Sequence, residues 1–166
     1  MLMSPVSVLD DPRMFKKILI PTDGSKLSAQ AANKGVCFAR AIGAEIVALY
    51  VTQPFAATVG FDGMAAAYAI TDEDYDRTAA EQAQKYLQAV LDRAETAGVK
   101  AKSLAVSNFN VADGIVQAAQ TEGCDLIFIG SHGRSGLSRL LLGSVTVKVL
   151  GLAKVATLVY RVKEND

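Results

Sequence analysis

The chain has 166 residues, of which 51% are apolar and 20% are charged. This balance is typical of one compact domain with a hydrophobic core, and it argues against an intrinsically disordered chain. Seventeen basic and seventeen acidic side chains cancel, so the net charge provides no long-range field to attract nucleic acid or an anionic membrane. We therefore expect no nucleic-acid partner and no membrane partner.

Targeting signals and reactive side chains are sparse. No apolar run approaches the roughly 20 residues needed to cross a bilayer, and no basic segment followed by a hydrophobic one opens the chain, so we expect a cytoplasmic protein. Cys37 and Cys124 lack metal-ligand spacing, and His132 is the single histidine. Both thiols are expected to be small, buried hydrophobic side chains.

Residues 1–13 contain two prolines and no periodicity. We interpret them as an N-terminal extension, either a flexible segment or a consequence of start-codon choice, ahead of one domain over residues 14–166. In that domain, β-branched runs predict strands and helical apolar spacing predicts helices. The expected elements are a strand at 15–20, a helix at 28–41 closed by Gly43, a strand at 45–51, a helix at 72–97, a strand at 99–106, a helix at 111–122, a strand at 126–129, a helix at 144–153 and a strand at 156–162.

The order of these elements predicts the fold class. Strands and helices alternate throughout, which indicates a single-domain, doubly wound α/β fold whose mainly parallel sheet is covered by helices on both faces, with right-handed crossovers. Residues 52–71 interrupt the alternation with a long connection that contains prolines and glycines and has room for one helical turn. Long connections of this kind are often functional.

A glycine-rich stretch follows the strand at 126–129. Gly130 and Gly133 come directly after the strand, and Gly143 and Ser144 stand where a helix is expected to begin. Glycine permits close backbone approach, and a helix N-terminus presents unpaired N–H groups to an anion. The stretch is therefore either a phosphate cradle or an ordinary glycine-rich loop in which Ser144 caps the helix.

Several enzyme classes are excluded by their motifs. The chain has neither the Gly-x-x-x-x-Gly-Lys-Ser/Thr loop of P-loop NTPases nor the Gly-x-Gly-x-x-Gly fingerprint of dinucleotide-binding dehydrogenases. It also lacks the Gly-x-Ser-x-Gly elbow of serine hydrolases, and its one histidine lies within the glycine-rich stretch.

The pattern Gly130-x2-Gly133-x9-Gly143-Ser144 resembles the nucleotide-binding signature of the ATP-binding universal stress proteins. Residues 15–25 (FKKILIPTDGS) resemble the first strand and turn of that family, and residues 125–133 and 143–149 resemble two further segments. The resemblance extends over residues 14–162. It implies a five-stranded sheet in the order 3-2-1-4-5, with nucleotide bound across the carboxyl ends of strands one and four.

The same resemblance implies the ligand and its contacts. Asp23 would lie near the adenine and ribose, the Val51 backbone would contact the adenine edge, and Gly130 would pack against the ribose and phosphates. ATP would be held with Mg²⁺ or Mn²⁺ bridging its phosphate oxygens. The candidate cofactor-binding residues are Pro21, Thr22, Asp23, Val51, Gly130, His132, Gly133, Arg134, Gly143, Ser144 and Val145.

No catalytic residue is assigned. His132 and Arg134 could stabilise charge on a transferring phosphoryl group, but a loop histidine and a solvated arginine near phosphates need not accelerate a reaction. Two segments depart from the family pattern: residues 153–157 (AKVAT) replace a Pro-Cys-Pro or similar segment, and residues 108–110 (NFN) replace a Gly-x-Pro.

Three functions are compared. The first is an ATP-binding regulatory stress protein with slow hydrolysis or self-phosphorylation at most, which forms a homodimer through its last strand and contacts an unidentified protein, with residues 52–71 as the responsive segment. The second is a nucleotide-independent dimeric interaction module of the same fold. The third, a kinase or nucleotidyl transferase for a small substrate, ranks last because no carboxylate pair suggests a general base.

Overall fold

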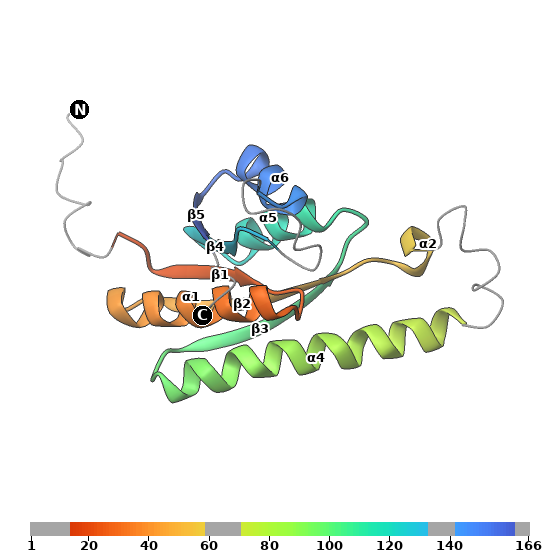
Figure 1. Cartoon of the computed structure of the whole chain (residues 1–166), viewed down its shortest axis with the longest axis horizontal. Helices are drawn as coiled ribbons and strands as arrows, with labels where there is room; N and C mark the ends of the chain where they lie inside the picture. The colour runs from red at the N-terminus through yellow and green to blue at the C-terminus, as the bar shows by residue number, and fades with distance from the viewer. Residues whose placement is uncertain (1–13, 59–70, 133–141, 162–166) are drawn as a thin grey trace, which may run out of the picture.

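The computed structural model describes residues 14–58, 71–132 and 142–161. Strands and helices alternate over these residues, as predicted (Figure 1). The elements are β1 (Lys17–Pro21), α1 (Lys26–Ile42), β2 (Glu45–Thr52), α2 (Phe55–Thr58), α4 (Asp72–Thr96), β3 (Ala101–Ser107), α5 (Val111–Thr121), β4 (Leu126–Gly130), α6 (Ser144–Leu152) and β5 (Ala156–Tyr160).

One parallel sheet forms the middle layer. In the described part of the chain it has five strands in the order β3-β2-β1-β4-β5, and every neighbouring pair is parallel. The predicted strand order is confirmed. Strand β1 is central, because its Ile18 pairs with Ile46 of β2 on one side and with Leu126 of β4 on the other. The crevice between the carboxyl ends of β1 and β4 is therefore the topological switch point of the sheet.

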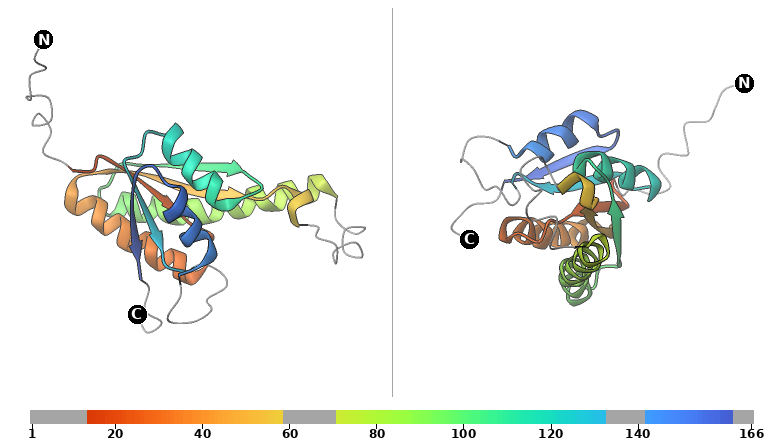
Figure 2. Two further views of the ribbon diagram at one scale, coloured as in Figure 1. Left: turned by 90° about the horizontal axis from the view of Figure 1, so that it is seen from above. Right: turned by 90° about the vertical axis from the view of Figure 1, so that its right-hand side faces the viewer.

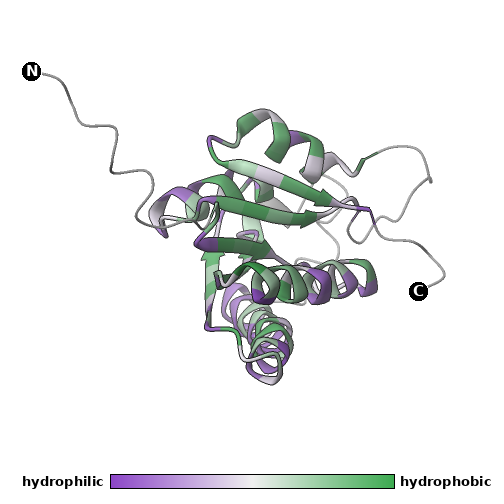
Figure 3. Cartoon of the chain, turned by 90° about the vertical axis from the view of Figure 1, so that its left-hand side faces the viewer, coloured by the Kyte–Doolittle hydropathy of each residue, from purple (hydrophilic) through white to green (hydrophobic). Residues whose placement is uncertain are grey.

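Alternate residues of the strands build two hydrophobic cores. Ile18, Ile20 and Phe128 belong to the core shared with α1 and α4, whereas Leu19 and Ile127 belong to the core shared with α5 and α6. Figure 2 shows these two helix pairs on opposite faces of the sheet. In Figure 3 the strands are largely hydrophobic, while α1 and α4 carry hydrophilic residues on their outer surfaces. The central strands are thus buried on both sides, as expected for a doubly wound sheet.

Side-chain caps define where three of the helices begin. Ser25 accepts a hydrogen bond from the Ser28 amide at the start of α1, Thr71 accepts one from the Asp74 amide at α4, and Asn110 does the same at α5. Helix α1 therefore begins two residues earlier than predicted. It ends, as predicted, at Gly43, whose left-handed φ of 69° suits glycine.

Helix α4 is longer than the sheet that it covers. Its buried residues, Ala83, Leu87, Val90 and Ala94, all lie in its C-terminal part. The preceding turns, residues 72–82, project past the strand ends together with α2 (Figures 1 and 2). We call residues 72–82 the α4 overhang. The core fixes the C-terminal part of α4, so the position of the overhang follows from it.

Several predictions are corrected in detail. Strand β3 begins at Ala101 and not at residue 99, because Val99 completes the turn after α4, where its N–H donates a hydrogen bond to the Ala94 carbonyl. Cys37 is exposed and Cys124 is buried, so the prediction of two buried thiols is wrong for Cys37. Helix α2 is the helical turn expected within residues 52–71. Residues 1–13, 59–70 and 162–166 lie outside the described residues. No described helix combines the length and hydropathy needed to cross a membrane.

Candidate functional site

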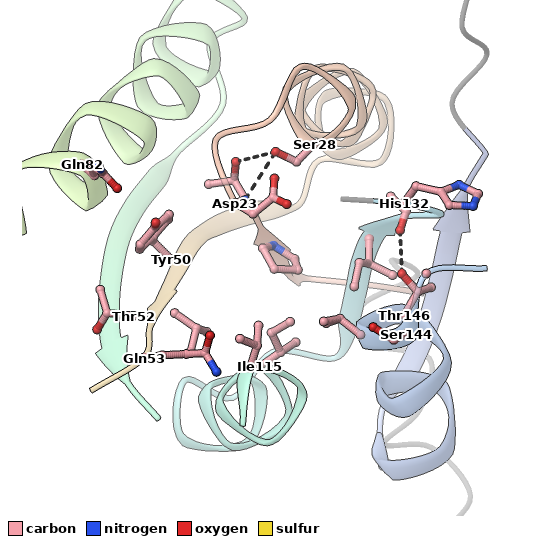
Figure 4. Close-up of a pocket in the computed structure, with 18 of the residues that line it drawn as sticks. Asp23, Ser28, Tyr50, Thr52, Gln53, Gln82, Ile115, His132, Ser144 and Thr146 are labelled. Carbon is pink, nitrogen blue, oxygen red and sulfur yellow. Dashed lines mark hydrogen bonds between the residues drawn. The ribbon is translucent and has the colours of Figure 1, made fainter. Parts of the chain in front are cut away.

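A cavity of about 540 Å³ opens at the carboxyl ends of the strands (Figure 4). This volume lies within the range of ordinary small-molecule sites. Its walls come from the ends of β1, β2 and β4, from the first turns of α5 and α6, and from the α4 overhang with Gln82 at its end. The lining residues are Pro21, Thr22, Asp23, Ser28, Tyr50, Val51, Thr52, Gln53, Tyr75, Thr78, Ala79, Gln82, Val111, Ile115, Ile129, Gly130, His132, Gly143, Ser144, Val145 and Thr146.

The turn after β1 carries the carboxylate of the cavity. The Thr22 amide donates to the Leu49 carbonyl at 2.8 Å, which ties the turn to β2. The Asp23 Oδ1 accepts a hydrogen bond from the Ser25 amide at 3.0 Å. The Ser28 hydroxyl lies 3.1 Å from the Thr22 hydroxyl and 3.4 Å from the Asp23 amide (Figure 4). Helix α1 therefore holds the turn from one side through Ser28.

The junction between β4 and α6 forms the opposite wall. The Gly143 amide donates to the Ser131 carbonyl at 2.8 Å, and the buried Thr146 hydroxyl donates to the Gly130 carbonyl at 2.9 Å. These two bonds fix the N-terminus of α6 against the end of β4. The close contact leaves little room at Gly143, because a Cβ there would stand 3.3 Å from the Ser131 carbonyl oxygen.

Helix α6 begins without a side-chain cap. Gly143 is its N-cap residue and Ser144 is the first helical residue, so the alternative in which Ser144 caps the helix is wrong. In the described part of the chain, no side chain caps the first turn. The amides of Ser144, Val145 and Thr146 have no intrahelical acceptor, because the first such bond runs from the Val147 amide to the Gly143 carbonyl. Three backbone donors and the positive end of a helix dipole thus lie at the cavity wall.

A model of a protein family, described as "Universal stress protein family", matches residues 14–161. The chain belongs to the universal stress protein family. Universal stress protein MJ0531 of Methanocaldococcus jannaschii is 35% identical over 92% of this chain and 86% of its own length. The solved structure of hypothetical protein MJ0577 is similar with a TM-score of 0.75 and 28% identity, covering 92% of this chain and 99% of that one. A universal stress protein solved in complex with cAMP has a TM-score of 0.64 and 23% identity, covering 90% and 98%.

Most of the residues predicted for the site of this universal stress protein lie in one place. Segments far apart in sequence meet at the cavity because the carboxyl ends of parallel strands share one edge of the sheet. Gly133 and Arg134 lie outside the described residues. The predicted residues that line the cavity are Pro21, Thr22, Asp23, Val51, Gly130, His132, Gly143, Ser144 and Val145. Their part in nucleotide binding stays a prediction.

The imidazole of His132 is turned away from the cavity. Figure 4 shows its ring directed away from Asp23 and Tyr50. Its Nδ1 lies 3.1 Å from the Ser131 hydroxyl, and its buried Nε2 has no hydrogen-bond partner among the described residues. His132 therefore contributes backbone rather than an acid or base to the cavity as it stands.

Sequence reasoning predicted Val51 at the end of β2 but missed its neighbours Tyr50, Thr52 and Gln53 and the whole of the α4 overhang. Tyr75, Thr78 and Gln82 line the cavity from α4, and their spacing of three and four residues would have placed them on one helix face. The Tyr75 hydroxyl donates to the Gln53 carbonyl at 2.9 Å, and the Tyr75 and Phe55 rings lie 5.3 Å apart. These contacts join α2, the end of β2 and the overhang into one wall.

The charge of the cavity is low. Asp23 is the one carboxylate among the described lining residues, and no cluster of three or more metal-binding side chains occurs in the described ranges. The protein side of this site can therefore supply one anionic group, three backbone donors, hydroxyls and apolar surface. That set suits recognition of a neutral base and a sugar beside an anion, and it provides no carboxylate pair for acid–base catalysis.

Proposed function

We propose that this universal stress protein binds ATP in the cavity and acts in the cytoplasm as a nucleotide-dependent regulatory protein of the stress response. The observation that carries the proposal is the N-terminus of α6, which no described side chain caps and whose first three amides lie at the switch point of the sheet, across the cavity from Asp23. Helix N-termini at such points are common sites for nucleotide phosphates.

Different residues around the cavity would contact the adenine, the ribose and the phosphates of ATP. Asp23 would accept hydrogen bonds from the ribose hydroxyls, and the Val51 backbone would contact the adenine edge. Gly130 would allow the ribose and phosphates to approach the end of β4, and the amides of Ser144 and Val145 would donate to the phosphates. Pro21 and Thr22 complete the turn on which Asp23 stands.

A divalent cation would be held through the phosphates rather than by a protein cage. The described residues contain no group of three or more side chains that could hold a metal ion. Mg²⁺ is commonly bound by one or two carboxylates together with substrate phosphates. Bound Mg²⁺ or Mn²⁺ would neutralise part of the phosphate charge. A structurally similar universal stress protein was solved in complex with cAMP. That likeness establishes the shared fold, and the choice of ATP is supported by the amides of this chain.

Regulation, and not turnover, is the activity that this cavity supports best. No second carboxylate stands in the described lining to activate water, so we propose at most slow hydrolysis or self-phosphorylation. ATP can favour one conformation of the protein only by binding that conformation more tightly. The α4 overhang would carry that difference to an unidentified protein partner, because it lines the cavity without contributing buried core residues.

We also propose a homodimer through β5. This strand is at the edge of the sheet, where unpaired backbone groups can pair with another strand. Helix α6, which adjoins it in sequence, exposes Val147, Leu150 and Leu152, by 53%, 44% and 47% respectively. Light scattering should give twice the 17.5 kDa mass of one chain, and Leu150→Asp should lower it. A monomer for the wild-type protein would refute this part.

The nucleotide proposal is tested by content and affinity. Freshly purified protein is denatured and the released nucleotide is identified; ATP is then titrated into the wild type and a Gly143→Val, Ser144→Ala double variant. Valine at 143 would crowd the Ser131 carbonyl and the amides of α6, so ATP affinity should fall by about 100-fold, the equivalent of about 3 kcal/mol. Gly151→Val is the matched control, because a side chain at Gly151 meets no atom within 4 Å.

The alternative is the nucleotide-independent dimeric module. Wild-type protein that neither carries nor binds ATP, but forms the dimer, would favour it. Equal ATP affinity in the wild type and in the double variant would instead place any nucleotide outside the α6 wall.

A further inference from the structure

The turn that carries Asp23 contains a glycine, Gly24, at the point where Tyr86 of α4 contacts the turn. Gly24 has a φ of 77°, a left-handed conformation that suits glycine. A Cβ built on Gly24 would overlap the ring of Tyr86, at its Cδ2, Cε2 and Cζ atoms. The ring of Tyr86 therefore occupies the space that any other residue at position 24 would need for its side chain.

The contact reaches the turn from the side of α4. Hydrogen bonds to Ser25 and Ser28 shape the turn locally, and the Thr22 amide ties the start of the turn to the Leu49 carbonyl of β2. Tyr86 lies 62 residues further along, and three atoms of its ring stand where the Cβ of any other residue at position 24 would be. Contact with a rigid element from a distant segment fixes where a turn stands, and not only how it folds.

Tyr86 is itself held by the core. It packs against the cluster that contains Ala83 and Leu87 of the same helix. Its ring lies 5.7 Å from that of Tyr50, at an interplanar angle of 35°. Tyr50 is 7% exposed and lines the cavity. The ring of Tyr86 thus joins the buried wall of the cavity to the turn that carries its carboxylate.

We infer that Tyr86 is a positioning residue, whose ring, seated on Gly24, holds Asp23 where its carboxylate meets the ribose hydroxyls of bound nucleotide. This inference deepens the proposed function and rests on it for the ribose contact. It assigns to α4 a part in nucleotide selection even though Tyr86 does not line the cavity. The hydroxyl of Tyr86 is not required for this, whereas the ring is.

The binding test compares ATP with 2′,3′-dideoxy-ATP by calorimetry. Wild-type protein should prefer ATP by about tenfold or more, because hydrogen bonds to a charged carboxylate are among the stronger ones. Tyr86→Leu should reduce the preference to less than about threefold, and Tyr86→Phe should retain it. Val90→Ala is the matched control, because Val90 is buried in the same core on the next turn of α4 and is not among the atoms nearest to Gly24. It should lower stability and leave the preference unchanged.

A second measurement needs no nucleotide. Hydrogen exchange of the unliganded protein should be faster in the peptide over residues 21–28 of Tyr86→Leu than in that of Val90→Ala or Tyr86→Phe. The inference is overturned if Tyr86→Leu and Val90→Ala exchange alike, if Tyr86→Leu keeps the wild-type preference, or if ATP-binding wild type shows no preference for the ribose hydroxyls. Failure of the wild type to bind either nucleotide refutes the proposed function alone, and hydrogen exchange then decides whether Tyr86 fixes the turn.

Discussion

Two threonines with buried hydroxyls allow one chemical change to be made in opposite hydrogen-bonding environments. Thr146 is 3% exposed and its hydroxyl donates to the Gly130 carbonyl at 2.9 Å. The buried hydroxyl of Thr157, on β5, has no partner among the described residues. Thr→Val replaces a hydroxyl by a methyl of similar size at each site. We expect Thr146→Val to destabilise the protein and Thr157→Val to leave it as stable or more stable.

The expected changes in the free energy of unfolding depend on whether each threonine hydroxyl has a hydrogen-bond partner in the folded protein. At Thr146 the change removes a hydrogen bond and takes a donor from a buried carbonyl, which costs about 1–2 kcal/mol in the free energy of unfolding. At Thr157 it removes a polar group that was buried without compensation, which should contribute about 1 kcal/mol of stability. For a chain of this size the melting temperature moves by about 2–4 °C for each kcal/mol. Thr146→Val should therefore melt about 3–6 °C lower, and Thr157→Val about 2–4 °C higher.

Urea unfolding followed by circular dichroism measures both changes against the wild type, and Thr146→Ser, which keeps the hydroxyl, is a control for the bond. Equal destabilisation by the two Thr→Val changes would refute the reasoning, because the burial of a hydroxyl would then matter more than its partner. A Thr146→Val protein as stable as the wild type would show that the bond between α6 and the end of β4 contributes nothing.

Three further predictions use other parts of the structure. Cys37, which is exposed, should react with a thiol reagent at pH 8 in the folded protein. Cys124 should react only on unfolding, because it is buried and burial raises its pKa from 9.0 to about 11. Equal labelling of the two thiols in the folded protein would contradict this prediction. Between pH 9 and 11 the unfolded chain loses this thiol proton while the folded chain keeps it, so stability should fall as pH rises through that window. Gly114→Ala should weaken ATP binding, since its Cβ would stand 2.9 Å from a methyl of Val51 at the cavity. If calorimetry gives the wild-type affinity for ATP, α5 shifts enough to accommodate the added methyl. ATP should slow hydrogen exchange in residues 75–82, and no change there would remove the α4 overhang from the proposed response.

The fold was predictable because its signals are local and repeated. Hydrophobic strands alternated with helical patterns, and each strand end could be read from the turn residues that follow it. These signals place Asp23, Val51 and Gly130 at one edge of a parallel sheet. The strand order itself came from the resemblance to the universal stress proteins, and the structure confirms it.

The missed residues depend on where a helix lies relative to the sheet. Tyr75, Thr78 and Gln82 share one side of α4, which is rotated from the buried face that contains Ala83 and Leu87. Periodicity identifies that face, but it does not reveal at which residue the sheet ends and the cavity begins. That boundary depends on packing between distant segments, so it is visible only in three dimensions.

Two errors had a different origin, because local rules competed there. Cysteine is commonly buried, but Cys37 stands between Val36 and Phe38 at a position of α1 that turns outward. Serine is favoured as an N-cap, yet Gly143 occupies that position, because its amide bonds to the Ser131 carbonyl and its backbone approaches β4 closely. In both cases the geometry of the element outweighed the preference of the residue type.

Because α4 projects beyond the sheet, the residues that stabilise the fold and the residues that shape the cavity lie in different parts of the helix. The buried residues lie in its C-terminal part, and the cavity residues lie in the overhang. Substitutions at Thr78 or Gln82 alter the cavity wall without removing a buried core contact. Such positions form a surface on which selectivity can be re-engineered, or can diverge among paralogues, at little cost in folding free energy, while the strand ends and the start of α6 remain as a common base.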